Sequence, residues 1–94
     1  MSHSSCERLF ELFAWEHRDL VYRVRFQDGD EFDLTLITAG QDDGEPPHGI
    51  ASVVRTVRRR DGTEWPERNA MFFHLPEIAE VADPASGNVL YRAG

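Results

Sequence analysis

The side chains best suited to catalysis or metal binding in this chain are few and widely scattered. They are one cysteine and four histidines, namely Cys6, His3, His17, His48 and His74. No HExxH, His-x-His or CxxC spacing occurs, so a zinc site would need ligands from distant parts of the chain. The motifs GxxxxGK[ST], GxGxxG and GxSxG are also missing. We therefore expect a protein that is not an enzyme and that uses neither a metal nor a cofactor.

Arginines next to aromatic residues form one candidate binding surface. The residues are Arg55, Arg58, Arg59, Arg60 and Trp65, followed by Phe72 and Phe73. Guanidinium groups beside aromatic rings suit the phosphates and stacked bases of a nucleic acid, so RNA binding is one hypothesis. The alternative is that these arginines lie at a solvated strand end and pair with nearby acids. This alternative is favoured over RNA binding.

Acidic residues form the second candidate surface. The candidate partner-binding residues are Glu7, Glu11, Asp28, Asp30, Glu31 and Asp33, with Asp42, Asp43 and Glu45 in a later loop. The chain has seventeen acids, ten arginines and no lysine, which gives a net charge of −7. Such a chain is repelled by nucleic acids and anionic membranes unless its arginines cluster. The acids therefore favour a protein partner with a basic surface.

The hairpin that must position many of these charges spans residues 21–38. Apolar residues are even-numbered on both sides of Asp28-Gly29, as Tyr22, Val24 and Phe26 and then Phe32, Leu34 and Leu36. This parity requires a loop with an odd number of residues if both sets share a face. The simplest loop is Asp28-Gly29-Asp30, with Gly29 at positive φ. It pairs Phe26 with Phe32, Val24 with Leu34 and Tyr22 with Leu36, and it places Arg25 opposite Asp33.

The remaining pattern predicts one mainly β domain over residues 1–94. A capping-box sequence and an apolar stripe predict a helix over about 5–18. Alternation and turn residues predict strands over about 20–27, 31–38, 50–60, 70–75, 78–82 and 88–92, with a long loop over 39–49. Five or six short strands after a helix suggest a small closed barrel of the Sm-like or SH3-like kind, because closure removes edge strands.

The same composition sets an expected location. A single cysteine excludes an internal disulfide framework and favours a reducing compartment. No apolar run approaches the ~20 residues of a membrane span, and no signal peptide is recognisable at the N-terminus. We expect a cytoplasmic protein.

Several short motifs resemble the Rho-binding antiterminator family. Cys6 before an amphipathic helix, an alternating strand and Asp28-Gly29 are followed by Leu75-x-x-Ile78 and Pro84-x-x-Gly87-x-Val89. The family consists of small bacterial proteins with an Sm-like barrel, and the likeness covers roughly two-thirds of this chain. It implies an acidic face that binds the RNA-binding domain of the termination factor Rho and so regulates transcription termination.

The helix departs from the family pattern Cys-Asp-x-Tyr-Asp-x-Leu-Glu. Cys6, an acid at Glu7 and Leu12 are kept, but Leu9-Phe10 replaces the Tyr-Asp pair and Phe13 replaces the final acid. These helix positions are among those that the resemblance places against Rho. The sequence therefore keeps two hypotheses open, an acidic module that binds a protein and an RNA-binding barrel.

Overall fold

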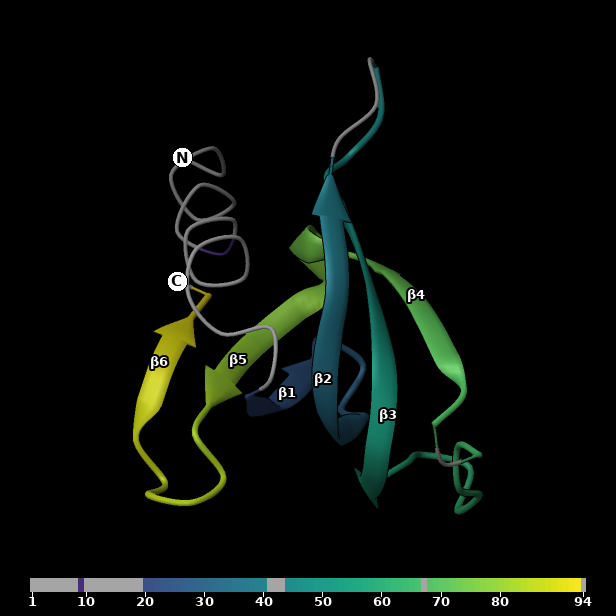
Figure 1. Ribbon diagram of the computed structural model, residues 1–94, viewed down its shortest axis with the longest axis vertical. Coiled ribbons are helices and arrows are strands. Elements are labelled where there is room, and N and C mark those ends of the chain that lie inside the picture. Colours follow the sequence, from purple (N-terminus) through teal and green to yellow (C-terminus); the bar gives the residue numbers. More distant parts are fainter. Residues whose placement is uncertain (1–8, 10–19, 41–43, 67, 94) are drawn as a thin grey trace.

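The protein is a six-stranded antiparallel β-sheet (Figure 1). The computed structural model describes residues 9, 20–40, 44–66 and 68–93. The strands are β1 (Val21–Phe26), β2 (Glu31–Gly40), β3 (His48–Arg58), β4 (Ala70–His74), β5 (Ile78–Ala82) and β6 (Val89–Arg92). A single turn of 3-10 helix, η1 (Leu75–Glu77), joins β4 to β5. The mainly β class is as the sequence predicts, and no strand end differs from its predicted position by more than two residues.

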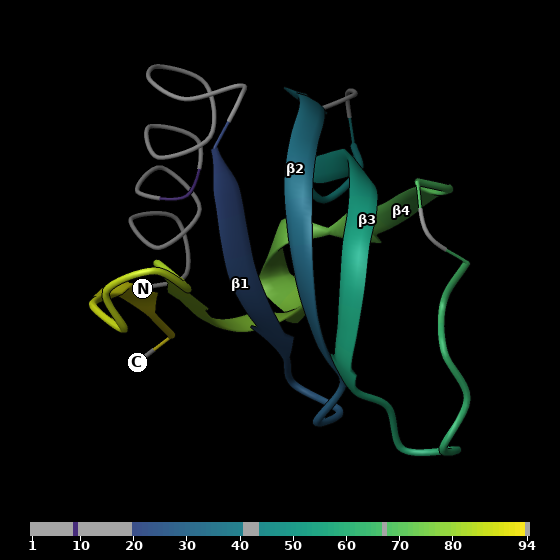
Figure 2. The ribbon, with the colours of Figure 1, turned by 60° about the horizontal axis from the view of Figure 1, so that its bottom comes forward.

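The sheet is open, which corrects the expected closed barrel. The strand order is β4-β3-β2-β1-β5-β6, so β4 and β6 are its two edges and they do not pair with each other. The strands curve around a common interior without completing a ring of hydrogen bonds (Figures 1 and 2). β4 has five residues and ends at η1, where Pro76 has no N–H to continue a ladder.

Most of the predicted N-terminal helix, residues 5–18, lies outside the described part of the chain. Leu9 is its one described residue, and it is helical and 1% exposed. Leu9 belongs to the hydrophobic core, which is otherwise built from strands and η1. The apolar stripe of the N-terminal segment therefore contributes at least this residue to the core.

The even-numbered apolar residues of β1 and β2 share the buried face, as their parity predicts. Tyr22, Val24, Phe26, Phe32, Leu34 and Leu36 are all at most 7% exposed. On neighbouring strands they meet Ala51, Val53, Met71, Phe73, Ile78 and Val81. Burying these side chains against one another supplies the main favourable free energy of this small fold.

The register of the β1–β2 hairpin differs from the prediction by two residues. Tyr22 pairs with Leu34 and Arg23 pairs with Asp33. The N–H of Phe26 donates to Asp30 O at 2.8 Å, so the three-residue loop is 27–29 rather than 28–30. Gly29, with φ of +99°, is the last loop residue, and its N–H donates to Phe26 O at 3.0 Å. Three-residue loops commonly end on a glycine of this conformation, which sets the observed register.

Candidate functional site

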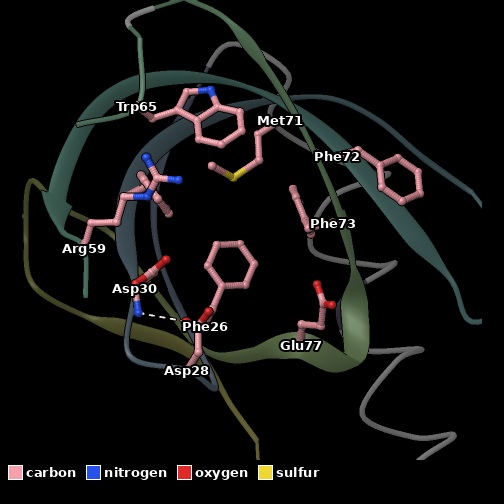
Figure 3. A pocket seen from close by; sticks show the side chains of 10 residues that line it. Phe26, Asp28, Asp30, Arg59, Trp65, Met71, Phe72, Phe73 and Glu77 are labelled. Atoms are coloured by element: carbon pink, nitrogen blue, oxygen red, sulfur yellow. Dashed lines mark hydrogen bonds between the residues drawn. The ribbon is translucent and has the colours of Figure 1, made fainter. Parts of the chain in front are cut away.

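A pocket of about 180 Å³ opens between the β1–β2 turn, the β3–β4 connection and η1. Its apolar lining comes from Phe26, Phe32, Trp65, Met71 and Phe73, and Figure 3 shows several of these side chains around the opening. Its charged lining comes from Asp28, Asp30, Glu77 and Arg59. The site therefore combines an apolar interior with a mostly acidic entrance.

The aromatic walls of the pocket are held by contacts with one another. The Phe26 ring packs edge-on against Phe73 at 5.4 Å and against Phe32 at 6.1 Å between ring centroids. Phe32 in turn contacts Trp65 edge-on at 6.4 Å. Phe26, Phe32 and Phe73 are also part of the buried core. The pocket walls are therefore fixed by the fold and need no ligand to arrange them.

Three carboxylates, Asp28, Asp30 and Glu77, surround the entrance; we call them the rim carboxylates. Each accepts one backbone hydrogen bond that orients it. Asp28 Oδ1 accepts from the N–H of Asp30 at 2.9 Å, and Asp30 Oδ1 accepts from the N–H of Arg60 at 2.9 Å. Glu77 Oε2 accepts from the N–H of His74 at 3.2 Å. None of the three forms a salt bridge to a described residue. Their negative charges therefore remain available to a cationic ligand.

Arg59 is the one cation in the pocket lining, and its contacts are within its own loop. Its guanidinium carbon lies 5.3 Å from the centroid of the Trp65 ring. Its Nη1 donates to Thr63 Oγ1 at 3.0 Å, and its Nε lies 3.8 Å from Asp61 Oδ1. Arg59 therefore stabilises the Trp65 wall rather than neutralising the rim carboxylates.

Asp33 belongs to a different arrangement on the opposite face of the sheet. It is 6% exposed and lies between two arginines on neighbouring strands. Arg23 donates to it through Nε at 2.8 Å and Nη2 at 3.1 Å, and Arg55 Nη2 donates at 3.0 Å. Burial alone would raise the pKa of Asp33, but the hydrogen bonds and charges of Arg23 and Arg55 together lower it. Asp33 thus forms a buried ion-pair cluster with Arg23 and Arg55.

The same face carries a second carboxylate shared by two arginines. Glu80 Oε2 accepts from Arg25 Nη2 at 3.4 Å and from Arg92 Nε at 3.3 Å. Glu31 pairs with Arg25 in the β1–β2 ladder and with Arg58 in the β2–β3 ladder. Acids and arginines therefore alternate across this face instead of forming separate patches.

The structure divides the acidic residues that the sequence grouped together. Asp28 and Asp30 line the pocket, whereas Glu31 and Asp33 lie among the arginines. Glu7 and Glu11, like Asp42 and Asp43, lie outside the described residues. The third rim carboxylate, Glu77, was missed by sequence reasoning, although the turn Leu75-Pro76-Glu77 before a strand could have suggested that it faces the hairpin loop.

The predicted arginine surface is interrupted in the same way. Arg55 is bound to Asp33, and Arg59 contacts Asp61. Arg58 is paired in register with Glu31, and the backbone of Arg60 donates to Asp30. Trp65 is partly buried, and its indole Nε1 is buried without a hydrogen-bond partner among the described residues. These five residues do not form a continuous basic and aromatic platform.

Comparison of the chain with models of protein families, with curated proteins and with solved structures gives no match. The resemblance to Rho-binding antiterminators therefore rests on the sequence motifs alone. Within residues 20–40, 44–66 and 68–93, no three His, Cys, Asp or Glu side chains are placed to hold a metal ion. No helix found in the described part of the chain is long and apolar enough to cross a membrane.

Proposed function

We propose that this protein is an acidic protein-binding module that docks its pocket end on a basic surface of another protein. The observation that carries the proposal is the set of three rim carboxylates, free of salt bridges to described residues, around an apolar pocket. The partner implied by the sequence resemblance is the RNA-binding domain of Rho. On this proposal the protein acts in the bacterial cytoplasm and regulates transcription termination by covering that surface.

Two contributions would favour binding of a basic surface at the pocket. The rim carboxylates attract a basic surface and raise the rate of encounter, and this contribution weakens as salt screens the charges. The apolar pocket then provides a place where a partner side chain loses contact with water. The net charge of −7 acts in the same direction as the rim carboxylates.

The arrangement of the arginines favours this function over RNA binding. A phosphate backbone is best held by a basic surface that is not interrupted by acids. Here Asp33 and Glu80 each lie between two arginines, and Glu31 is paired in register with Arg25 and Arg58. An approaching phosphate would meet a carboxylate beside the guanidinium groups of Arg23, Arg25, Arg55 and Arg92.

The test is titration calorimetry with the purified RNA-binding domain of Rho at two salt concentrations. The informative variant is Asp28→Asn, Asp30→Asn and Glu77→Gln combined, because each amide keeps a hydrogen-bond acceptor while the charge is removed. The matched control combines Glu64→Gln, Glu80→Gln and Asp83→Asn, which removes the same charge from residues that do not line the pocket. We expect the rim variant to bind at least about tenfold more weakly, and the control to bind nearly as wild type.

Three results would count against the proposal. Equal weakening by both triple variants would show that only net charge matters. Absence of binding by the wild type at low salt would exclude Rho as the partner. Recovery of RNA instead of protein on the immobilised wild type from a bacterial lysate would favour the RNA-binding alternative.

A further inference from the structure

On its outer side, strand β4 has backbone groups with no hydrogen-bond partner among the described residues. β4 is an edge strand, and β3 is its one neighbour in the sheet (Figure 1). Two hydrogen bonds show which backbone groups of β4 point towards β3. The N–H of Leu75 donates to Pro47 O at 2.8 Å, and the N–H of Val53 donates to Asn69 O at 3.2 Å. In an antiparallel ladder the odd-numbered β4 residues therefore bond to β3. The N–H and C=O groups of Ala70 and Phe72 point the other way, to what we call the open edge.

The open edge is short and well defined. His74 would be the next residue to present its N–H there, but that N–H already donates to Glu77 Oε2. The N–H groups left for a partner are those of Ala70 and Phe72. A segment of only a few residues could therefore pair with this edge.

The open edge borders the pocket. Phe72 lines the pocket although its ring is turned away from it, as Figure 3 shows. The ring instead stacks with His48 at 5.3 Å and meets His74 edge-on at 5.2 Å. The part of Phe72 that faces the pocket is therefore its backbone. Unpaired strand groups and rim carboxylates lie around the same opening.

We propose that the pocket receives an extended segment of the protein partner, which adds a strand to the open edge of β4 and inserts a basic side chain between the rim carboxylates. This inference rests on the proposed function and specifies how the partner is bound. Strand addition is a common way for an exposed sheet edge to bind a peptide, with main-chain hydrogen bonds for affinity and pockets for alternate side chains.

The charge and the apolar lining of the pocket favour a basic side chain of the partner. In an added strand, alternate side chains would lie on the same face as Met71 and Phe73, which line the pocket. An arginine or lysine at such a position would pack its alkyl stem against these apolar walls. Its charged head would then meet Asp28, Asp30 and Glu77 at the entrance.

The probe for this inference is a fluorescein-labelled hexapeptide of alternating arginine and valine, with binding followed by fluorescence anisotropy at low salt. Two further peptides are N-methylated, one at its arginines and one at its valines. In an extended strand the N–H groups of successive residues point to opposite sides, so either the arginine N–H groups or the valine N–H groups face β4. Strand addition therefore requires that one methylated peptide binds at least about tenfold more weakly than the unmethylated peptide. The other methylated peptide should bind as tightly as the unmethylated one.

The matched protein variants are Phe72→Pro and Phe72→Ala. Proline removes the N–H of the open edge without removing a bond to β3, whereas alanine keeps that N–H. We expect Phe72→Pro to lose at least about tenfold in affinity and Phe72→Ala to bind nearly as wild type. Amide exchange at Ala70 and Phe72, measured by NMR on the wild type, should slow when the unmethylated peptide is bound.

The outcomes separate this inference from the proposed function. Equal binding of both methylated peptides, together with unchanged amide exchange at Phe72, overturns strand addition even if Phe72→Pro fails to fold. If binding then still depends on the rim carboxylates, the proposed function stands without the inference. Failure of the wild type to bind the peptide overturns the inference, while the Rho-domain titration decides the proposed function separately.

Discussion

Asp33 accepts two hydrogen bonds from the guanidinium of Arg23, its direct neighbour across the β1–β2 ladder. A third comes from Arg55 on β3, so one buried carboxylate joins three strands. The two cations lower the pKa of Asp33 in spite of its burial, because removing its charge would leave both arginines without their partner. This ion-pair cluster stabilises the hairpin register in which Asp28 and Asp30 line the pocket.

Replacing Asp33 by asparagine should destabilise the protein by about 2 kcal/mol at neutral pH, since hydrogen bonds to charged groups are lost from a buried site. The pKa of Asp33 is lower in the folded than in the unfolded protein. Its contribution is therefore complete above the unfolded pKa of about 3.9 and disappears as the pH falls through the lower folded pKa. Urea denaturation should show a difference in the free energy of unfolding between wild type and variant at pH 7, and this difference should become smaller in acid.

The matched control for that prediction is Glu80→Gln. Glu80 also lies between two arginines, but its contacts are longer, at 3.4 and 3.3 Å, and its side chain is 22% exposed. We expect Glu80→Gln to lower the free energy of unfolding by less than about 1 kcal/mol. A loss as large as that of Asp33→Asn would show that burial does not set the strength of these clusters.

Gly29→Val should destabilise the hairpin by about 1 kcal/mol or more. Gly29 has φ of +99°, a conformation that a β-branched residue adopts only with strain. No heavy atom lies within 4 Å of an added Cβ, so the cost would be conformational and not steric crowding by neighbours. Asparagine tolerates positive φ better than valine, so the melting temperature of Gly29→Asn should lie between those of the wild type and Gly29→Val. Equal melting temperatures of all three proteins would refute the turn assignment.

Gly49→Ala should destabilise the core by about 1–3 kcal/mol, the usual cost of overpacking. An added Cβ at Gly49 would lie 2.8 Å from Cζ and 2.9 Å from Cε2 of Phe73, a buried ring that also forms a pocket wall. Gly40→Ala is the control, because its nearest contacts, at 3.6 Å to the His48 ring, are ordinary. Comparing the two melting temperatures tests whether this close approach is needed.

Glu7 and Glu11 give a prediction that rests on the sequence alone. The helical pattern places both on the polar face, so reversing both to lysine should abolish capture of the basic partner while leaving the melting temperature nearly unchanged. The measurement is a pull-down from bacterial lysate at two salt concentrations beside the wild type. Equal recovery of Rho by both proteins would show that Glu7 and Glu11 do not contribute to binding.

The sequence by itself determined the strands and the buried face of the hairpin. Alternation of apolar and polar residues is a local signal, and a shift by one residue would expose every even-numbered side chain of β1 and β2. The parity of Tyr22, Val24 and Phe26 against Phe32, Leu34 and Leu36 was therefore enough to place them together. It left a shift by two residues open, because such a shift keeps the same faces.

Only the tertiary structure decided the register, the open sheet and the composition of the site. Asp28 and Asp30 are equivalent in sequence to Glu31 and Asp33, since all four are acids near one turn. Which of them point to the pocket depends on long-range pairing: Asp33 meets Arg55, 22 residues away, while Glu77 reaches the hairpin end through η1. Such charge pairings depend on the positions of whole strands, which no local periodicity encodes.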